Sequence, residues 1–270
     1  MKPKVTVIIP TINRTSLLDV LNSVIGQTFQ GYEVIIVDDS KEQSVESSEF
    51  NVIRTGGLVG VSKARNLGMS HASTEFIALL DDDDHWTTEY LEKQLMNIDR
   101  LEIDFGITGA IVNGRRRPRT PLNLGIDPYE LLYGQPHILR SKAYLPTSTY
   151  LFKTKIIEKV KFDESITDRE NLKFVWDCFN NNYRIYQDPQ SLVSIDYSSK
   201  NSLSRINIQQ EIDWSHYLKN KSETWSDNFL IESARNFLRI GERESAKALT
   251  QHLNSEKKTL HKTILKLATN

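Results

Sequence analysis

The stretch that decides the fold is Glu75-Phe-Ile-Ala-Leu-Leu-Asp-Asp-Asp-Asp-His-Trp86, in which an apolar run ends at four consecutive carboxylates. The apolar part, Phe76–Leu80, is too short for most helices and is typical of a strand buried on both faces of a parallel sheet. The four acids therefore follow the carboxyl end of a strand. Open α/β sheets bind their ligands at that edge, so the stretch predicts a ligand site there.

The acidic run contains an Asp-x-Asp pair. If the backbone stays extended, Asp81 and Asp83 share one face and Asp82 points away. Two carboxylates on one side suit Mg²⁺ or Mn²⁺, ions that usually keep open positions for substrate phosphates. The alternative is that Asp84 and Thr87 cap the helix that follows, while the other acids are solvated.

The composition is that of an ordinary soluble globular protein of 270 residues, with 39% hydrophobic and 26% charged residues. A net charge of −1 gives no overall attraction to nucleic acid or anionic lipid, so no nucleic-acid partner is expected. Cys178 is the only cysteine, which excludes an intrachain disulfide and indicates a reducing, cytoplasmic location. The amino terminus lacks the features of a signal peptide, and no apolar segment approaches the ~20 residues that span a bilayer. These features predict a soluble or peripheral protein.

Strand and helix patterns alternate along the first two hundred residues. Strands are predicted at 5–9, 32–37, 51–54, 76–80, 105–112, 148–152, 185–186 and 192–195, and helices at 16–27, 62–71, 88–101, 155–160 and 171–180. This order predicts a wound parallel sheet whose strands end on one side. Asp38 and Asp39 would then line the same edge as the acidic run, unless they only form a turn.

Two regions depart from this alternation. Residues 113–145 begin with a basic segment and show little periodicity, so we interpret them as a long functional loop. After residue 204 only helices are predicted, at 208–218, 228–240, 244–254 and 257–268. One helical pair there has the small-residue spacing of a tetratricopeptide-like repeat, although one copy is weak support. We therefore predict a first domain of residues 1–204 and a helical region of residues 205–270.

Several segments match, in order, the motifs of one enzyme family. They are Val7–Arg14, Ser23–Thr28, Glu33–Ser40, Gly60–Gly68, Phe76–Trp86 and Phe162–Ser165. On these segments the chain resembles the inverting family 2 glycosyltransferases, over about residues 4–196 and most strongly in the first ninety. The resemblance implies an α/β fold of the GT-A type, a mostly parallel sheet flanked by helices, followed here by a helical appendage. The residues after the first strand match neither a dinucleotide-binding nor a phosphate-binding glycine motif.

The resemblance also implies roles for individual residues. Asp81 would contact the ribose of a nucleotide, Asp83 would bind the metal that bridges its diphosphate, and Asp39 would read the base edge. The other residues that would border the nucleotide are Pro10, Thr11, Asn13, Asp82 and Arg65, with the Arg65 guanidinium suited to phosphate charge. For Lys63 we favour ordinary solvation, His85 is left out of the metal site, and Trp86 is expected to be a packing residue.

The catalytic base is where this chain departs from the family. An inverting transfer needs a base for the acceptor hydroxyl, and the family usually supplies it from a Glu-Asp pair ahead of a helix. Here the pair reads Glu170-Asn171, and asparagine cannot accept that proton at neutral pH. Glu170 is therefore the first candidate and Asp168 the second, although both could simply stabilise the helix amino terminus.

Together with the composition, the resemblance implies a metal-dependent hexosyltransferase of the cytoplasm, peripheral to the inner face of the cell membrane. Its donor would be a uridine or deoxythymidine diphosphate sugar, and its acceptor a glycan or lipid-linked glycan of lipopolysaccharide, capsule or other surface polysaccharide. The alternative is a related protein that binds nucleotide sugars or glycans without turnover. The final segment 257–268 has a basic and an apolar stripe, which indicates either peripheral membrane contact or packing on the preceding helices.

Overall fold

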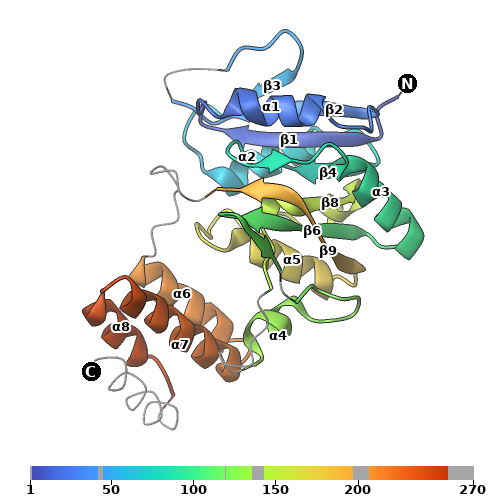
Figure 1. Ribbon diagram of the computed structural model, residues 1–270. Coiled ribbons are helices and arrows are strands. Elements are labelled where there is room, and N and C mark those ends of the chain that lie inside the picture. Colours follow the sequence, from blue (N-terminus) through green and yellow to red (C-terminus); the bar gives the residue numbers. More distant parts are fainter. Residues whose placement is uncertain (1, 42–44, 119, 136–142, 197–206, 255–270) are drawn as a thin grey trace. The chain divides into compact units, whose positions relative to one another are not determined.

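The computed structural model describes residues 2–41, 45–118, 120–135, 143–196 and 207–254 (Figure 1). The chain divides into two compact units. The first comprises Met1–Pro128 and Lys142–Lys200, and the second comprises Tyr129–Ser141 and Asn201–Asn270. Residues 129–141, which the predicted boundary at 204 leaves in the first domain, are thus grouped with the C-terminal helices. Segment 257–268, where a final helix is expected, lies outside the described residues.

The first unit is built on one sheet. Within the described residues its strands are β1 (Val5–Thr11), β2 (Tyr32–Asp38), β3 (Asn51–Arg54), β4 (Phe76–Leu79), β5 (His85–Trp86), β6 (Phe105–Val112), β7 (Arg115–Arg117), β8 (Tyr150–Lys153) and β9 (Ile185–Ile195). They lie in the order β3-β2-β1-β4-β8-β6-β9-β5, and β7 pairs with β6. β1 is parallel to β2 and β4, while β8 is antiparallel to both β4 and β6. β6 therefore runs in the direction of β1, β2 and β4, and these strands end at one edge. The predicted mostly parallel α/β sheet is confirmed.

Helices of the first unit flank this sheet (Figure 1). They are α1 (Leu17–Ile25), α2 (Val61–Ser70), α3 (Tyr90–Leu101) and α5 (Glu170–Asn180), with 3-10 turns η1 (Thr147–Thr149) and η2 (Thr154–Glu158). Gly68 allows α2 to lie directly on the sheet, because a Cβ there would come within 2.5 Å of Ile8 and 2.8 Å of Val37. The contact fixes α2 against β1 and β2.

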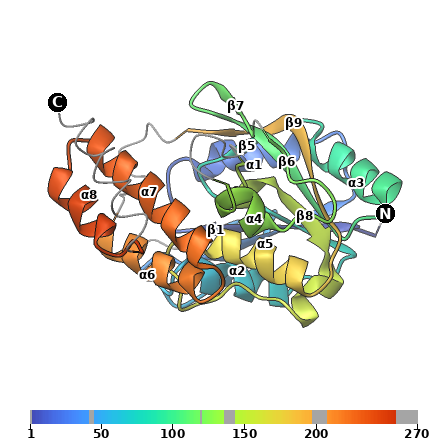
Figure 2. The ribbon, with the colours of Figure 1, turned by 90° about the horizontal axis from the view of Figure 1, so that it is seen from below.

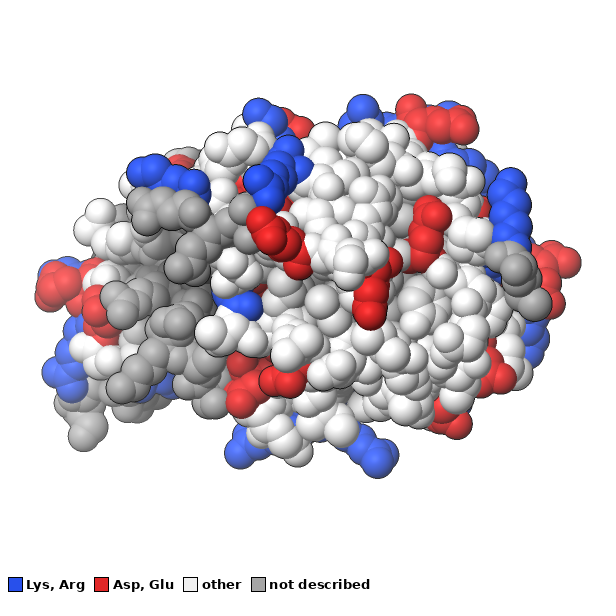
Figure 3. All heavy atoms as spheres, turned by 90° about the horizontal axis from the view of Figure 1, so that it is seen from above, with Lys and Arg blue, Asp and Glu red and all other residues white. Residues whose placement is uncertain are grey.

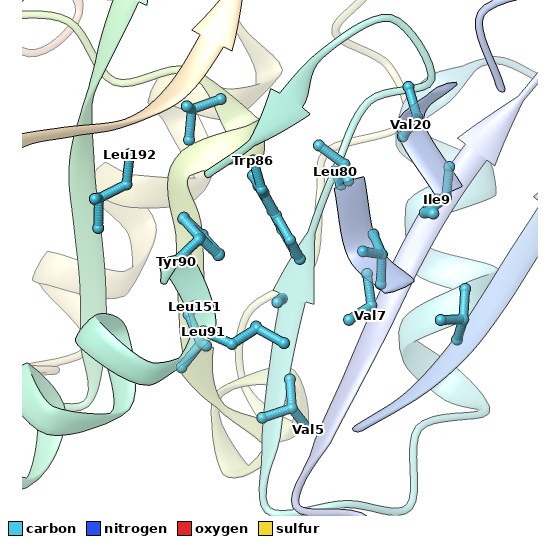
Figure 4. Packing of buried hydrophobic residues seen from close by; sticks show 14 of the residues in the cluster. Val5, Val7, Ile9, Val20, Leu80, Trp86, Tyr90, Leu91, Leu151 and Leu192 are labelled. Atoms are coloured by element: carbon cyan, nitrogen blue, oxygen red, sulfur yellow. The ribbon is translucent and has the colours of Figure 1, made fainter. Parts of the chain in front are cut away.

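On one side of the sheet, buried side chains of β1 and β4 pack in one core with side chains of the segment that follows the acidic run (Figure 4). The Trp86 ring stacks on the Tyr90 ring with their centroids 4.1 Å apart, and the Trp86 indole N–H donates to the Ser148 carbonyl at 2.8 Å. Trp86 is only 5% exposed, so the interpretation as a packing residue is confirmed. Through Trp86 and Tyr90 the core holds both ends of the segment that follows the four acids.

The region after β6 is more ordered than the sequence analysis predicts. Instead of a structureless loop, it contains β7 and the short helix α4 (Pro128–Tyr133). Val112 pairs with Arg115, so Asn113 and Gly114 form a two-residue hairpin turn with φ values of 46° and 75°. Positive φ at both positions is the hallmark of a type I′ turn, for which Asn-Gly is a preferred sequence. The prediction of a loop is wrong for this part of the region, because hydrophobic periodicity alone does not reveal a turn signal of two residues.

Two further elements differ from the prediction. β9 is one strand that passes through Pro189, where two short strands are predicted, and its pairing with β6 shifts register beside Gly109. A Cβ at Gly109 would lie 2.7 Å from the carbonyl oxygens of both Arg117 and Pro189, so the irregular pairing depends on glycine. The predicted helix at 155–160 is the 3-10 turn η2.

The second unit is helical. It contains most of α4 together with α6 (Ile208–Lys219), α7 (Glu223–Arg239) and α8 (Arg243–Thr250). The buried Tyr129 ring of α4 makes edge contacts with the rings of Trp214 and Trp225 at 6.0 and 5.9 Å, and the Trp225 indole N–H donates to Glu130 at 2.8 Å. These contacts attach α4 to the C-terminal helices. None of the helices in the described part of the chain has the length and apolar character that a membrane crossing requires.

Candidate functional site

The predicted site residues gather at the carboxyl edge of the sheet because β1, β2 and β4 all end there. Thr11 is the last residue of β1, Asp39 follows β2, and the acidic run follows β4. Pro10 and Thr11 are buried, and Asn13 is half-buried with its backbone N–H donating to the Thr11 hydroxyl at 2.9 Å. The topology thus brings together residues that lie seventy positions apart in sequence.

Asp82 faces the end of β1 rather than solvent. Its carboxylate accepts a hydrogen bond from the Thr11 hydroxyl at 2.6 Å and one from the Arg14 guanidinium at 2.9 Å. The Ser16 hydroxyl donates to the Asp82 carbonyl at 2.6 Å. Burial raises the pKa of Asp82, while Thr11 and Arg14 oppose that shift. Asp82 therefore supports the acidic run by tying it to the segment after β1.

Asp83 is more accessible than Asp82. Its side chain is 36% exposed, and the Arg14 guanidinium lies 2.5 Å from its Oδ2 atom. Burial raises the pKa of Asp83, and Arg14 partly offsets the rise. Among the described residues no group of three or more His, Cys, Asp or Glu side chains could hold a metal alone. Mg²⁺ and Mn²⁺ are commonly held by one or two carboxylates together with substrate phosphates, and Asp83 is a carboxylate of that kind, which Arg14 contacts here.

Asp81 is joined to the candidate base by a buried arginine. One Arg65 amino group lies 2.6 Å from Asp81 Oδ1, and the other lies 2.8 Å from Glu170 Oε1. Arg65 is 3% exposed, and its guanidinium lies over the Phe162 ring at 5.2 Å. Burial would lower the pKa of Arg65, but the two carboxylates outweigh it and raise that pKa. Arg65 thus stays charged and holds Asp81 and Glu170 together.

The two candidate bases differ in their surroundings. Glu170 begins α5, and its side chain is 13% exposed beside Arg65. Asp168 is 43% exposed and pairs with its neighbour Arg169. Asn171, at the position where the family has aspartate, donates from its amide to the Leu145 carbonyl at 2.8 Å. Of these residues, Glu170 is the carboxylate that the structure connects to the acidic run.

Asp84, the last residue of the acidic run, is buried. The Ser148 hydroxyl donates to its Oδ2 atom at 2.5 Å and accepts from the Asp81 backbone N–H at 3.1 Å. Burial, followed by the charge of Asp81, raises the pKa of Asp84 well above its ordinary value. The expected alternative of a helix cap is not realised at Asp84, because its side chain instead bonds to the segment before β8.

Asp39 shapes the loop between β3 and α2. Its carboxylate accepts hydrogen bonds from the Thr55 hydroxyl and from the backbone N–H groups of Val59 and Gly60, the last two at 2.8 and 3.0 Å. Asp39 is 5% exposed. The carboxylate therefore fixes the loop that leads into α2 and to Arg65.

Sequence reasoning missed two residues of this site. Arg14 contacts both Asp82 and Asp83, and Ser148 links Asp84 to the Asp81 backbone. A cation five residues past the predicted end of the first strand lies at the acidic edge, which is a signal that could have indicated Arg14. Ser148 precedes an antiparallel strand, and the sequence holds no signal for its position.

Solved structures share this fold. The chain aligns with the crystal structure of S. aureus TarS 1-349 with a TM-score of 0.58 and 17% identity, over 91% of this chain and 90% of that one. It aligns with S. aureus TarS 1-349 in complex with UDP-GlcNAc with a TM-score of 0.59 and 20% identity, over 93% and 72% of the two chains. At such low identity these similarities establish the fold and no more.

Sequence comparison extends the similarity to curated proteins. The chain is 28% identical to the succinoglycan biosynthesis protein ExoW of Rhizobium meliloti, over 82% of this chain and 76% of that protein. It is also 28% identical to the amylovoran biosynthesis glycosyltransferase AmsB of Erwinia amylovora, over 59% of this chain and only 58% of that protein. The profile of the family described as "Glycosyl transferase family 2" matches residues 6–163, more than half of the chain. This protein therefore belongs to glycosyl transferase family 2.

Proposed function

We propose that the protein is an inverting, metal-dependent glycosyltransferase that moves a sugar from a nucleoside diphosphate to the hydroxyl group of a glycan or lipid-linked glycan. The observation that carries the proposal is the Arg65 bridge, which joins Asp81 of the Asp-x-Asp pair to Glu170 at one sheet edge. A single displacement needs a bound donor and a base for the acceptor hydroxyl, and the bridge holds a candidate residue for each role close together.

The proposed donor is a uridine or deoxythymidine diphosphate sugar. Structures of the similarly folded S. aureus TarS in complex with UDP and with UDP-GlcNAc support a nucleotide sugar as the donor. Thr11, Asn13 and Asp39 would border the nucleoside, and Asp81 its ribose. A hexose as the transferred sugar is part of the proposal.

The charges that change during the transfer explain the roles proposed for Asp83 and Glu170. When bound, Mg²⁺ or Mn²⁺ would neutralise the diphosphate as it leaves, and Asp83 would hold that ion. Glu170 would accept the proton of the attacking acceptor hydroxyl on a carboxylate oxygen. Arg65 keeps Glu170 in place beside Asp81, at Nη–O distances of 2.8 and 2.6 Å.

The proposed setting is surface polysaccharide synthesis. Relatives named for succinoglycan, amylovoran and teichuronic acid biosynthesis support it. A lipid-linked acceptor would place the enzyme at the cytoplasmic face of the membrane, where the basic segment 257–268 is proposed to make peripheral contact. Lipopolysaccharide and capsule are the proposed product classes.

Calorimetric titration with UDP and Mn²⁺, followed by hydrolysis and transfer assays with a panel of nucleotide sugars, tests the proposal. We expect binding that EDTA abolishes and that Asp83→Ala weakens, because the substitution removes the proposed metal ligand. Asp19→Ala, which removes an exposed carboxylate from α1, serves as the control. Equal affinity with and without EDTA would overturn the metal assignment. Metal-dependent binding without hydrolysis or transfer of any sugar would favour the non-catalytic alternative.

A further inference from the structure

Strand β7 consists of three consecutive arginines, Arg115–Arg117, at the tip of the β6–β7 hairpin. Their side chains form no ion pair or hydrogen bond with the rest of the described chain. Every other described arginine of the first unit has a partner: Arg14, Arg54, Arg65, Arg169 and Arg184 contact carboxylates, and Arg100 bonds to Asn97. Among the described arginines of the first unit, the three hairpin arginines are thus the exceptions, because each of the others contacts a carboxylate or, for Arg100, an amide.

The hairpin holds these arginines in a defined arrangement. Arg115, Arg116 and Arg117 pair with Val112, Ile111 and Ala110 of β6, and the Asn113-Gly114 turn fixes this register. Alternate residues of a strand share a face, so Arg115 and Arg117 lie on one face about 7 Å apart. The guanidinium groups are therefore carried by a paired strand rather than by an irregular loop.

The sheet order places the hairpin on the side of β4 that lies away from β1 and β2, the strands that would border the nucleoside. β6 ends at the same edge as β1, β2 and β4, and it lies beyond β8, on the side of β4 away from β1. Figure 2 shows the β6–β7 hairpin extending past the ends of the neighbouring strands. The nucleoside-binding strands and the hairpin therefore flank the acidic run from opposite sides.

The charge of the hairpin is local. The whole chain has a net charge of −1, and acidic and basic side chains are interspersed over the face drawn in Figure 3. Three adjacent like charges repel one another, and an anionic ligand would relieve that repulsion. The planar guanidinium matches the geometry of phosphate oxygens. A single carboxylate would compensate only one of these charges, whereas a diphosphate that joins two groups carries two negative charges and matches Arg115 and Arg117, which share a face.

We propose that Arg115–Arg117 bind a phosphate or diphosphate group of the acceptor, so that the substrate class is a phosphate-bearing glycan or lipid-linked glycan. The inference rests on the proposed transferase function and adds an anionic subsite beside it. The phosphate belongs to the acceptor rather than to the bilayer, because the arginines lie at the edge where the sugar would be transferred.

Binding of geranyl diphosphate to the full chain tests the subsite. The titration is made in EDTA and about 50 mM salt, so that metal-dependent binding at Asp83 is switched off while electrostatic binding remains measurable. We expect the triple variant R115Q/R116Q/R117Q to bind at least tenfold more weakly. The matched control K2Q/K159Q/K161Q removes three exposed positive charges elsewhere, and it should change the affinity less than twofold. The variant R115K/R116K/R117K keeps the positive charges but lacks the planar guanidinium groups, so it should bind with intermediate affinity.

Thermal melts of each variant identify any that fail to fold. If the glutamine variant does not fold, the affinity of the lysine variant is compared with that of the unmodified protein. Unchanged geranyl diphosphate binding in the glutamine variant, or an equal loss in the control, would overturn the subsite. Hairpin-dependent sedimentation with phosphatidylglycerol vesicles, without geranyl diphosphate binding, would assign the arginines to the membrane and also overturn it. A parallel UDP and Mn²⁺ titration of the unmodified protein reports separately on the proposed function.

Discussion

At the scale of single residues, the site is organised by arginines that each join two carboxylates. Arg14 contacts Asp82 and Asp83, and Arg65 contacts Asp81 and Glu170. Four of the acids that gather at the edge are thereby partly compensated before any ligand arrives. This arrangement makes the role of Glu170 testable apart from the binding of the donor.

Glu170→Gln should lower the transfer rate by about 10²–10⁴-fold while leaving UDP affinity within a few fold, because the amide cannot accept the acceptor proton. Stopped or continuous transfer assays alongside calorimetry measure the two effects. Asp168→Asn is the matched control, since that carboxylate is more exposed and pairs with Arg169. Full activity of Glu170→Gln together with loss in Asp168→Asn would move the role to Asp168. Asn171→Asp, which restores the usual family residue, should keep or raise the rate.

Asp38 should make stability depend on pH. Burial opposes its ionisation, but hydrogen bonds from the Ser40 and Val45 N–H groups and the charge of Arg54 lower its pKa below the ordinary value. A lowered folded-state pKa stabilises the protein above the unfolded pKa of ~4, and the stabilisation is lost as pH falls through the folded value.

Asp38→Asn should therefore reduce the free energy of unfolding by about 1.5–3 kcal/mol at pH 7, the range for hydrogen bonds to a charged group. Urea unfolding at pH 7 and pH 3 measures the difference, which should shrink at the lower pH. A deficit of the same size at both pH values would contradict the charge-based explanation.

The residues of the site were predictable to different degrees. The acidic run was predicted at a strand end because an apolar run stops there, which is a local pattern. The burial of Arg65 between Asp81 and Glu170 was not, since it depends on α2 packing against β1 and β2 and on α5 beginning beside it. The contact of Arg14 was missed for the same reason, because a long side chain finds its partner across the fold.

At the scale of elements, strands and helices form where the sequence predicts them if one hydrophobic pattern runs through the whole element. β4 is a continuous apolar run, β1 and β2 are largely apolar, and α1 buries Leu17, Val20 and Val24 on one face. Turn chemistry was the weaker point, because Asn113-Gly114 signals a hairpin that hydrophobic periodicity alone does not reveal. β9 was divided in two because Pro189 interrupts its pattern, and only the pairing with β6 shows that the strand continues.

The packing of α2 on the sheet gives a prediction for this element. Gly68→Val should lower the free energy of unfolding by about 1–3 kcal/mol, because the added carbons would clash with Ile8 and Val37. The gain in helix propensity, roughly 0.5 kcal/mol, is smaller. Urea unfolding measures the loss, and Ser70→Ala, on an exposed position of α2, is the control. Unchanged stability would show that α2 does not rest on β1 and β2 as closely as described.

At the scale of the whole molecule, α4 belongs largely with the C-terminal helices. Tyr129→Ala removes a fully buried ring that contacts Trp214 and Trp225, so it should cost the second unit about 3–5 kcal/mol. Hydrogen exchange should rise in α6 and α7 while β1, β2 and β4 keep their protection. Ile126→Ala, at a 44% exposed position of the same segment, should leave both patterns unchanged. Increased exchange in the sheet instead would contradict the grouping.

The assignment of residues 129–141 to the helical unit means that the chain passes between the two units three times, after residues 128, 141 and 200. A gene fusion that exchanges everything beyond residue 200 would replace only one of the two pieces of that unit. The incoming helices would meet Tyr129 and Tyr133, which are shaped for Trp214 and Phe229. Recombination at a single junction is therefore a poor route to new combinations of these units. Lineages that change the helical unit should instead show paired changes in both pieces.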